Sequence, residues 1–187
     1  MINKQGKIIV LFAGLPYSGK TAIIHGMMNI LPGAAVYIDS VFREFVPESE
    51  VCLVRWLQAG TELVERIKKK IENSDESIIY VEIGILQQQH RKALSEWINR
   101  KQYRCIPILL NCNSKELVAA RQAIRAKEVA TSHNRLKIAI DLEELYGPIS
   151  TAFQMPSEEE GYITIDTSSS IEQNISVIYS ILTSITS

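Results

Sequence analysis

Short continuous apolar runs alternate along the chain with longer segments in which apolar residues recur every three or four positions. A continuous run is typical of a strand covered on both faces, and a period near 3.6 is typical of an amphipathic helix. The five runs that predict strands are residues 7–13, 34–38, 77–83, 103–111 and 161–166. Because parallel strands need crossovers that cover the sheet, the alternation predicts a doubly wound α/β domain, a five-stranded parallel sheet with helices on both faces.

Helices are predicted between these strands at residues 21–31, 51–71, 88–101 and 114–127, and after residue 169. Two of them begin with the spacing of a capping box, Asn113 with Glu116 and Ser169 with Glu172. Within the fourth apolar run, Pro107 indicates a bend or a late start of the strand. No internal repeat or linker interrupts the pattern, so a single domain over residues 1–187 is predicted.

Composition removes several classes of protein. With 187 residues, 46% hydrophobic and 22% charged, the chain can bury a core and is neither disordered nor fibrous. A net charge of -1 gives no global field for nucleic acid or an anionic membrane, so an anionic ligand must be held by local chemistry. We therefore expect no nucleic acid and no membrane among the partners.

The N-terminal apolar run is short and leads into a glycine loop, unlike a signal peptide, and no stretch approaches the ~20 apolar residues of a membrane span. Three scattered cysteines, Cys52, Cys105 and Cys112, favour a reducing compartment. A cytoplasmic location is expected.

The strongest chemical signal follows the first strand, where residues 14–21 read Gly-Leu-Pro-Tyr-Ser-Gly-Lys-Thr, a Walker A pattern between a strand and a helix. In such a loop backbone N–H groups cradle phosphate oxygens, and the helix N-terminus favours negative charge. Lys20 is expected to reach the β- and γ-phosphates and Thr21 to bind Mg²⁺. The alternative is a fortuitous glycine turn. The predicted site for ATP and Mg²⁺ consists of Gly14, Leu15, Pro16, Tyr17, Ser18, Gly19, Lys20 and Thr21.

Further features occur in order with this loop: Asp39 after the second strand, an Arg-x3-Arg helix after the fourth, and Ile-Asp-Thr at the end of the fifth. Together they resemble the small P-loop kinases of the nucleotide-kinase-like group, especially those like adenylylsulfate kinase and chloramphenicol phosphotransferase. The resemblance implies the sheet order 2-3-1-4-5, transfer of the γ-phosphoryl group of ATP to an acceptor, and a mobile lid around residues 114–135. Tyr17 departs from the pattern, because those kinases carry a small residue there: either its side chain points outward or the phosphate pocket is unusual.

Asp39 and Arg43 are candidates for the acceptor side of the site. Carboxyl ends of parallel strands face the ligand crevice, so Asp39 is placed to accept the proton of an acceptor hydroxyl. The alternative is that Asp39 or Ser40 caps the next helix. Arg43, four residues later, is a candidate for holding an anion of the acceptor, or for a surface salt bridge.

Glu82 follows the apolar residues 78–81 of the third strand, where an acidic residue can bind Mg²⁺ through water or contact the acceptor. The alternative is a buried glutamate paired with Lys20. The three histidines have no metal-ligand spacing, so no metal other than Mg²⁺ is predicted.

Arg121 and Arg125 share one helical face because they are four residues apart. The resemblance implies that they belong to the lid, close over the triphosphate and neutralise charge that develops during transfer, with Lys127 and Arg135 as further candidates. The alternative is a solvated basic face.

Asp166 and Thr167 match the segment that lines the adenine site in similar kinases. Residues 40–60 and 83–92 are expected to form the walls of the acceptor site.

The leading function is an ATP-dependent phosphotransferase acting on a hydroxyl of a small molecule. One alternative is a kinase acting on a polynucleotide end or another polymer, although no aromatic-basic cluster supports nucleic acid. The other is a nucleotide-binding regulator or an ATPase without an acceptor. A guanine-reading pattern is missing, since Asn113-Ser-Lys-Glu116 is a poor match.

Overall fold

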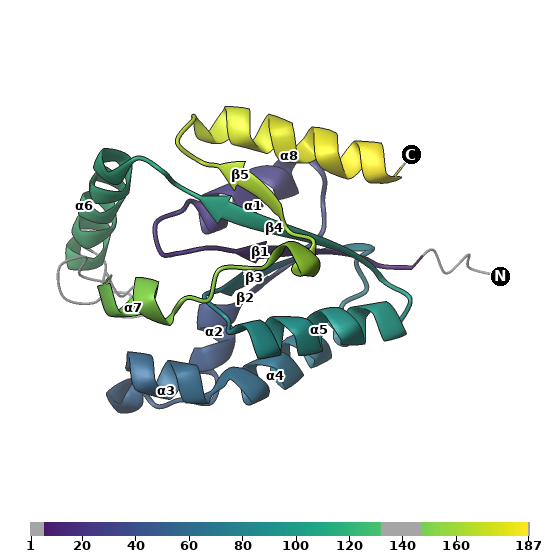
Figure 1. Ribbon diagram of the computed structural model, residues 1–187, viewed down its shortest axis with the longest axis horizontal. Helices are drawn as coiled ribbons and strands as arrows, with labels where there is room; N and C mark the ends of the chain where they lie inside the picture. The colour runs from purple at the N-terminus through teal and green to yellow at the C-terminus, as the bar shows by residue number, and fades with distance from the viewer. Residues whose placement is uncertain (1–5, 132–146, 187) are drawn as a thin grey trace.

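One parallel sheet with the strand order β2-β3-β1-β4-β5 organises the molecule (Figure 1). The structure is a computed structural model that describes residues 6–131 and 147–186. All four neighbouring strand pairs are parallel, which confirms the predicted fold class and the order implied by the resemblance. The strands are β1 (Ile8–Ala13), β2 (Ala34–Tyr37), β3 (Ile78–Gly84), β4 (Arg104–Asn111) and β5 (Ile163–Asp166).

Helices cover both faces of the sheet, and Figure 1 shows α8 with α1 on one side and α4 with α5 on the other. Single 3-10 turns occur at Glu48–Glu50 and Glu158–Glu160. The helices are α1 (Lys20–Ile30), α2 (Ile38–Arg43), α3 (Leu53–Gln58), α4 (Gly60–Asn73), α5 (Gln88–Arg100), α6 (Lys115–Thr131), α7 (Gly147–Ala152) and α8 (Ile171–Thr186).

The core has two halves because side chains alternate across each strand. In the central strand β1, Ile9 and Leu11 pack with α2, α4 and α5, whereas Val10 and Phe12 pack with α1 and α8. All four are fully buried. The continuous apolar run of β1 is therefore explained by burial on both faces.

The helix predicted over residues 51–71 is wrong as a single element, because α3 ends at Gln58 and α4 begins at Gly60. The ring of His90 packs so closely on Gly60 that a Cβ atom there would clash with it. Beyond this break the predicted stripe is buried, but Val54 on α3 is 63% exposed, since α3 turns away from the sheet.

Neither predicted capping box forms at the predicted residues: α6 has a single cap one residue later, and α8 has a reciprocal pair one residue later. The Oγ atom of Ser114, not the side chain of Asn113, accepts the backbone N–H of Leu117 at 3.1 Å and caps α6. At α8, the side chains of Ser170 and Gln173 each accept the other's backbone N–H, at 3.3 and 3.2 Å.

Pro107 neither bends β4 nor delays its start, because it lies inside the strand opposite Leu11 of β1. The pairing of β4 with β5 begins only at Ile108, so the ring lies where β4 has one neighbouring strand. A missing N–H is tolerated in such a place.

A buried ion pair joins the start of α5 to the segment before β5. Arg91 donates from Nε and Nη2 to the two carboxylate oxygens of Glu160, both at 2.8 Å, and from Nη1 to the carbonyl of Leu86 at 2.6 Å. Arg91 is fully buried. The loop between β3 and α5 is thereby held next to the segment that enters β5.

Candidate active site

The loop between β1 and α1 has the backbone of a phosphate-binding loop. Gly14, Tyr17 and Gly19 have φ values of 144°, 63° and 90°, in the region that L side chains rarely adopt. A Cβ atom at Gly14 would collide with the carbonyl oxygen of Leu110. The N–H of Gly14 donates to the carbonyl of Gly84 at 3.1 Å, which ties the loop to the end of β3.

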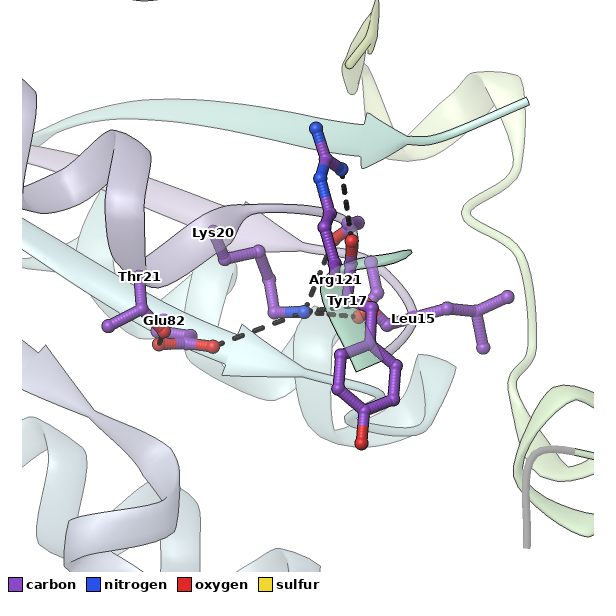
Figure 2. Close-up of polar contacts among 8 residues, drawn as sticks. Leu15, Tyr17, Lys20, Thr21, Glu82 and Arg121 are labelled. Carbon is purple, nitrogen blue, oxygen red and sulfur yellow. Dashed lines mark hydrogen bonds and ion pairs between the residues drawn. The ribbon is translucent and has the colours of Figure 1, made fainter. Parts of the chain in front are cut away.

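Lys20 lies folded back into this loop (Figure 2). Its Nζ donates to the carbonyls of Gly14 and Leu15 at 3.0 and 2.7 Å and to the Oγ of Ser18 at 3.3 Å. Glu82 approaches the same atom at 4.0 Å. Burial lowers the pKa of Lys20, while the nearby negative charges act against this shift. The amino group of Lys20 is thus held by neutral carbonyl and hydroxyl acceptors, which a bound anion such as a phosphate can replace.

Thr21 and Glu82 form the second polar contact of the loop. The Thr21 hydroxyl donates to Oε2 of Glu82 at 3.1 Å. Burial raises the pKa of Glu82, and the Lys20 charge lowers it. Hydroxyl and carboxylate oxygens are hard donors suited to Mg²⁺, which keeps part of its coordination for water and phosphate. Within residues 6–131 and 147–186, no cluster of three or more His, Cys, Asp or Glu side chains is arranged to hold a metal ion by itself.

Two residues near Glu82 were not predicted as part of the site. His25 lies one helical turn after Thr21, and its ring meets that of Tyr37 edge-on at 5.8 Å between centroids. Tyr37 is the neighbour of Glu82 in the β2–β3 register. Burial and the Glu82 charge raise the pKa of the Tyr37 hydroxyl. Only the strand register brings these side chains together, so the sequence carried no signal for them.

Asp39 lies in the first turn of α2, not at the end of a strand as predicted. The N-cap of this helix is Tyr37, and no side chain caps it, so the capping alternative for Asp39 and Ser40 is wrong. The Asp39 side chain reaches solvent. The protein atoms around its carboxylate remove part of its hydration, and this desolvation raises its pKa. The charges of three cations act in the opposite direction: Lys20, Arg43 and Arg125.

Arg121 connects the phosphate loop to the turn after β5. Its Nη1 donates to the carbonyl of Tyr17 at 3.0 Å and its Nη2 to the carbonyl of Thr167 at 2.8 Å. In Figure 2 the Arg121 guanidinium approaches the Tyr17 carbonyl from one side, and the Tyr17 ring points away to the other side. Arg125, one turn further along α6, acts on Asp39 through its charge. These contacts do not fit a purely solvated basic face.

The role of the two other cations predicted for the lid, Lys127 and Arg135, stays a prediction. Lys127 is exposed on α6. Arg135 and the second part of the predicted lid lie outside the described residues.

Asp166 and Thr167 form the turn that receives Arg121. The Asp166 carboxylate accepts the N–H and hydroxyl of Ser168 at 2.9 and 2.7 Å and the amide of Asn113 at 3.1 Å. The hydrogen bonds from Ser168 and Asn113 lower the pKa of Asp166. Thr167 is fully buried. Asp166 therefore shapes the turn, and Thr167 contributes its backbone carbonyl.

An open groove of about 310 Å³ lies between β5 and α8 and is lined in part by Ile163, Asp166 and Gln173. No residue of the phosphate loop lines it. The groove is therefore separate from the candidate site around Lys20.

The chain is similar to known proteins in its fold and not in its sequence. No family model matches the chain, and no curated protein matches it. A sugar kinase from Janibacter sp. HTCC2649 shares the fold with a TM-score of 0.61, 16% identity and 94% of each chain covered. A gluconokinase from Sinorhizobium meliloti 1021 has a TM-score of 0.59 and 15% identity over 91% of this chain and 87% of that one.

A shikimate kinase from Acinetobacter baumannii, solved with shikimate, has a TM-score of 0.54 and 16% identity, with 97% of this chain and 96% of that one covered. At such identities the comparisons show the fold, which is that of P-loop kinases. The narrower likeness to adenylylsulfate kinase and chloramphenicol phosphotransferase stays a prediction. Within the described residues, no helix is both long enough and apolar enough to cross a membrane.

Proposed function

We propose that the chain is an ATP-dependent phosphotransferase that moves the γ-phosphoryl group of Mg-ATP to a hydroxyl of a small molecule. One arrangement carries the proposal. The amino group of Lys20 lies in the phosphate loop 4.0 Å from the Glu82 carboxylate, and Asp39, exposed in the first turn of α2, is close enough for the charges of Lys20 and Arg125 to act on its pKa. A phosphate-binding lysine, a carboxylate open to solvent and an arginine from a following helix thus converge. The shared fold with kinases whose names specify sugar, gluconate and shikimate supports the same reading.

The nucleotide is assigned to the loop between β1 and α1. The N-cap of α1 is Gly19, and no side chain caps the helix, so its first N–H groups are available to phosphate oxygens. Lys20 exchanges the Gly14 and Leu15 carbonyls for the β- and γ-phosphates. Thr21 would hold Mg²⁺ directly and Glu82 would hold it through water. The chemistry that Mg²⁺ would supply there is neutralisation of the charge that grows during transfer.

Asp39 is assigned to the acceptor. A carboxylate beside the γ-phosphate can orient the attacking hydroxyl and take its proton. The raised pKa of Asp39 brings it closer to the pH at which it must work as a base, which makes it a better proton acceptor. Because Asp39 is open to solvent, a hydroxyl compound can reach it without a rearrangement of α2.

The two arginines of α6 receive different roles. Arg125 supplies positive charge near the point of transfer. Arg121 holds the Tyr17 carbonyl and so positions the phosphate loop relative to the turn at Thr167, which is assigned to the nucleotide side together with Asp166.

The test is ADP release from Mg-ATP with and without a panel of small hydroxyl compounds. Turnover is expected to be slow alone and to rise by orders of magnitude with a suitable acceptor, and Lys20→Ala should abolish the rise. Lys69→Ala, at an exposed position of α4, is the control and should behave as wild type. Fast hydrolysis that no acceptor changes would instead identify an ATPase.

A further inference from the structure

The end of β3 leaves the regular sheet close to the phosphate loop. Glu82 is the last residue of β3 that pairs with both β1 and β2. Ile83 has no partner in β1, because Ala13 pairs with Gly84, which has a φ of 53°. Such a bulge changes the direction of a strand and is frequent next to active sites. Beyond Glu82, contacts other than the regular strand pairing therefore help to hold the chain.

Two hydrogen bonds lead from this bulge to the lysine of the phosphate loop. The carbonyl of Gly84 accepts the N–H of Gly14 at 3.1 Å. The carbonyl of Gly14 in turn accepts Nζ of Lys20 at 3.0 Å. On its other side Gly14 faces the carbonyl of Leu110 in β4. The position of Gly84 therefore determines where the phosphate loop begins.

Arg91 of α5 holds the stretch that follows the bulge. Its Nη1 donates to the carbonyl of Leu86 at 2.6 Å, and the N–H of Leu86 donates to the carbonyl of Ile83 at 3.1 Å. Arg91 is fully buried and Leu86 is buried as well. A buried carbonyl without a donor is costly, so Leu86 depends on Arg91 for its hydrogen bond.

Glu160 fixes the direction of the Arg91 guanidinium. Its two carboxylate oxygens accept Nε and Nη2, both at 2.8 Å. Burial would raise the pKa of Glu160, but hydrogen bonds from Arg91 and from the Ser157 N–H hold it below its ordinary value, so the carboxylate is charged. A buried ion pair adds little stability over apolar side chains of the same size, because desolvation offsets the attraction. Its planar, two-bond geometry instead directs Nη1 at Leu86.

From these contacts we infer that Arg91 is a positioning residue of the phosphate loop, which it holds through Leu86 and Gly84, while Glu160 keeps it in place. The inference rests on the proposed function, since it takes Gly14 and the loop after it as the nucleotide site. Arg91 acts through the backbone and does not itself touch the nucleotide. Its loss should therefore weaken nucleotide binding by more than the loss of stability explains.

Two variants separate positioning from stability. Arg91→Met removes the donor to Leu86 and leaves the Glu160 charge buried without its partner, so Tm should fall strongly. In the double variant Arg91→Met, Glu160→Gln, that charge is gone and the amide oxygen can still accept the Ser157 N–H, so Tm should recover toward wild type. Leu86 lacks its donor in both. Isothermal titration with Mg-ADP, at a temperature where each chain is folded, should give a Kd raised roughly 3–30-fold in both, the range for residues within such a network.

Ile71→Ala is the control for stability. Ile71 is fully buried at the end of α4, and its carbonyl binds Lys7 just before β1, whereas the phosphate loop follows β1. This variant should lower Tm and leave the Kd for Mg-ADP unchanged.

The double variant decides the matter if Arg91→Met does not fold. A Kd that returns to the wild-type value together with Tm would overturn the inference, as would an equal rise of Kd in Ile71→Ala. Both results leave the proposed function intact, because the wild-type chain still binds Mg-ADP. A wild-type chain that binds no Mg-ADP would refute the proposed function, and the inference with it.

Discussion

The hydroxyl of Thr21 donates a 3.1 Å hydrogen bond to the carboxylate of Glu82, 61 positions further along the chain. It joins the first turn of α1 to β3, the strand beside β1 in the sheet. Lys20 approaches the other oxygen of the same carboxylate. The phosphate loop is therefore linked to a neighbouring strand by the residues to which nucleotide and metal are assigned.

Nucleotide should stabilise the fold, because the loop exists only in the folded chain. At about 100 times its dissociation constant, Mg-ATP should add about 2.7 kcal/mol to the free energy of unfolding. For a domain of this size, that corresponds to a rise in Tm of about 5–10 °C. Thermal denaturation with and without Mg-ATP measures it. Lys20→Ala should lose most of the rise, and Thr21→Val should lose the part that depends on magnesium. Unchanged Tm with every nucleotide tried would contradict the site.

Asp39→Asn should separate binding from transfer. The change removes the proton acceptor but leaves the loop untouched, so nucleotide affinity should stay within a few-fold of wild type. Transfer should fall by about 10²–10⁴, the usual contribution of a positioned general base. Steady-state ADP release and isothermal titration give the two values. Asp75→Asn, the same change at an exposed position before β3, is the control. If transfer survived in Asp39→Asn, the role of base would pass to Glu82.

Stability should depend on pH through Asp39 in a defined direction. The folded pKa of Asp39 is raised above the ordinary value of 3.8. Between these two values the folded state binds more protons than the unfolded state, so this group's contribution to stability falls as pH rises through that window. Asn does not ionise, so without ligands the Tm of Asp39→Asn relative to wild type should rise with pH above about 4 and then level off. A difference that shrinks as pH rises would show that the carboxylate is stabilised by its cations.

Arg121 and Arg125 should give different phenotypes although they are one turn apart. Arg121→Ala removes two hydrogen bonds to carbonyls and should cost about 2 kcal/mol of stability, together with nucleotide affinity. Arg125→Ala should act mainly on kcat, because its charge is directed at the acceptor side. Urea denaturation and kinetics of both variants check this, with Lys69→Ala as a neutral reference. Equal losses of stability and equal kinetics would show that the pair acts as one unit.

The fold was predictable because its signals are local. The residues of β1 are buried on both faces, which requires the continuous apolar run that identified the strand. The phosphate loop is a backbone motif of eight adjacent residues, so its sequence determines its geometry. The sheet order, by contrast, followed from the resemblance to P-loop kinases, since alternation alone does not order the strands.

The errors arose where distant residues compete with local preferences. Asn113 has the spacing of a cap, but its amide binds Asp166, 53 positions away, and Ser114 caps α6 instead. The helix break before Gly60 lies beneath the ring of His90, which belongs to another element. Arg91 is buried in α5 because Glu160, 69 positions later, supplies its partner. None of these contacts can be predicted from the residues adjacent in the sequence, because each joins residues that are far apart along the chain.

The packing of α8 on α1 affects how the protein is made. The phosphate loop precedes all of its structural partners along the chain, because β1 pairs with β3 and β4 and α1 packs against α8. A chain still attached to the ribosome carries the complete motif long before it carries a complete core half around Ile23 and Ile178. Competence to bind nucleotide should therefore arise only after α8 has been synthesised, and until then the apolar residues of β1 remain uncovered in the nascent chain.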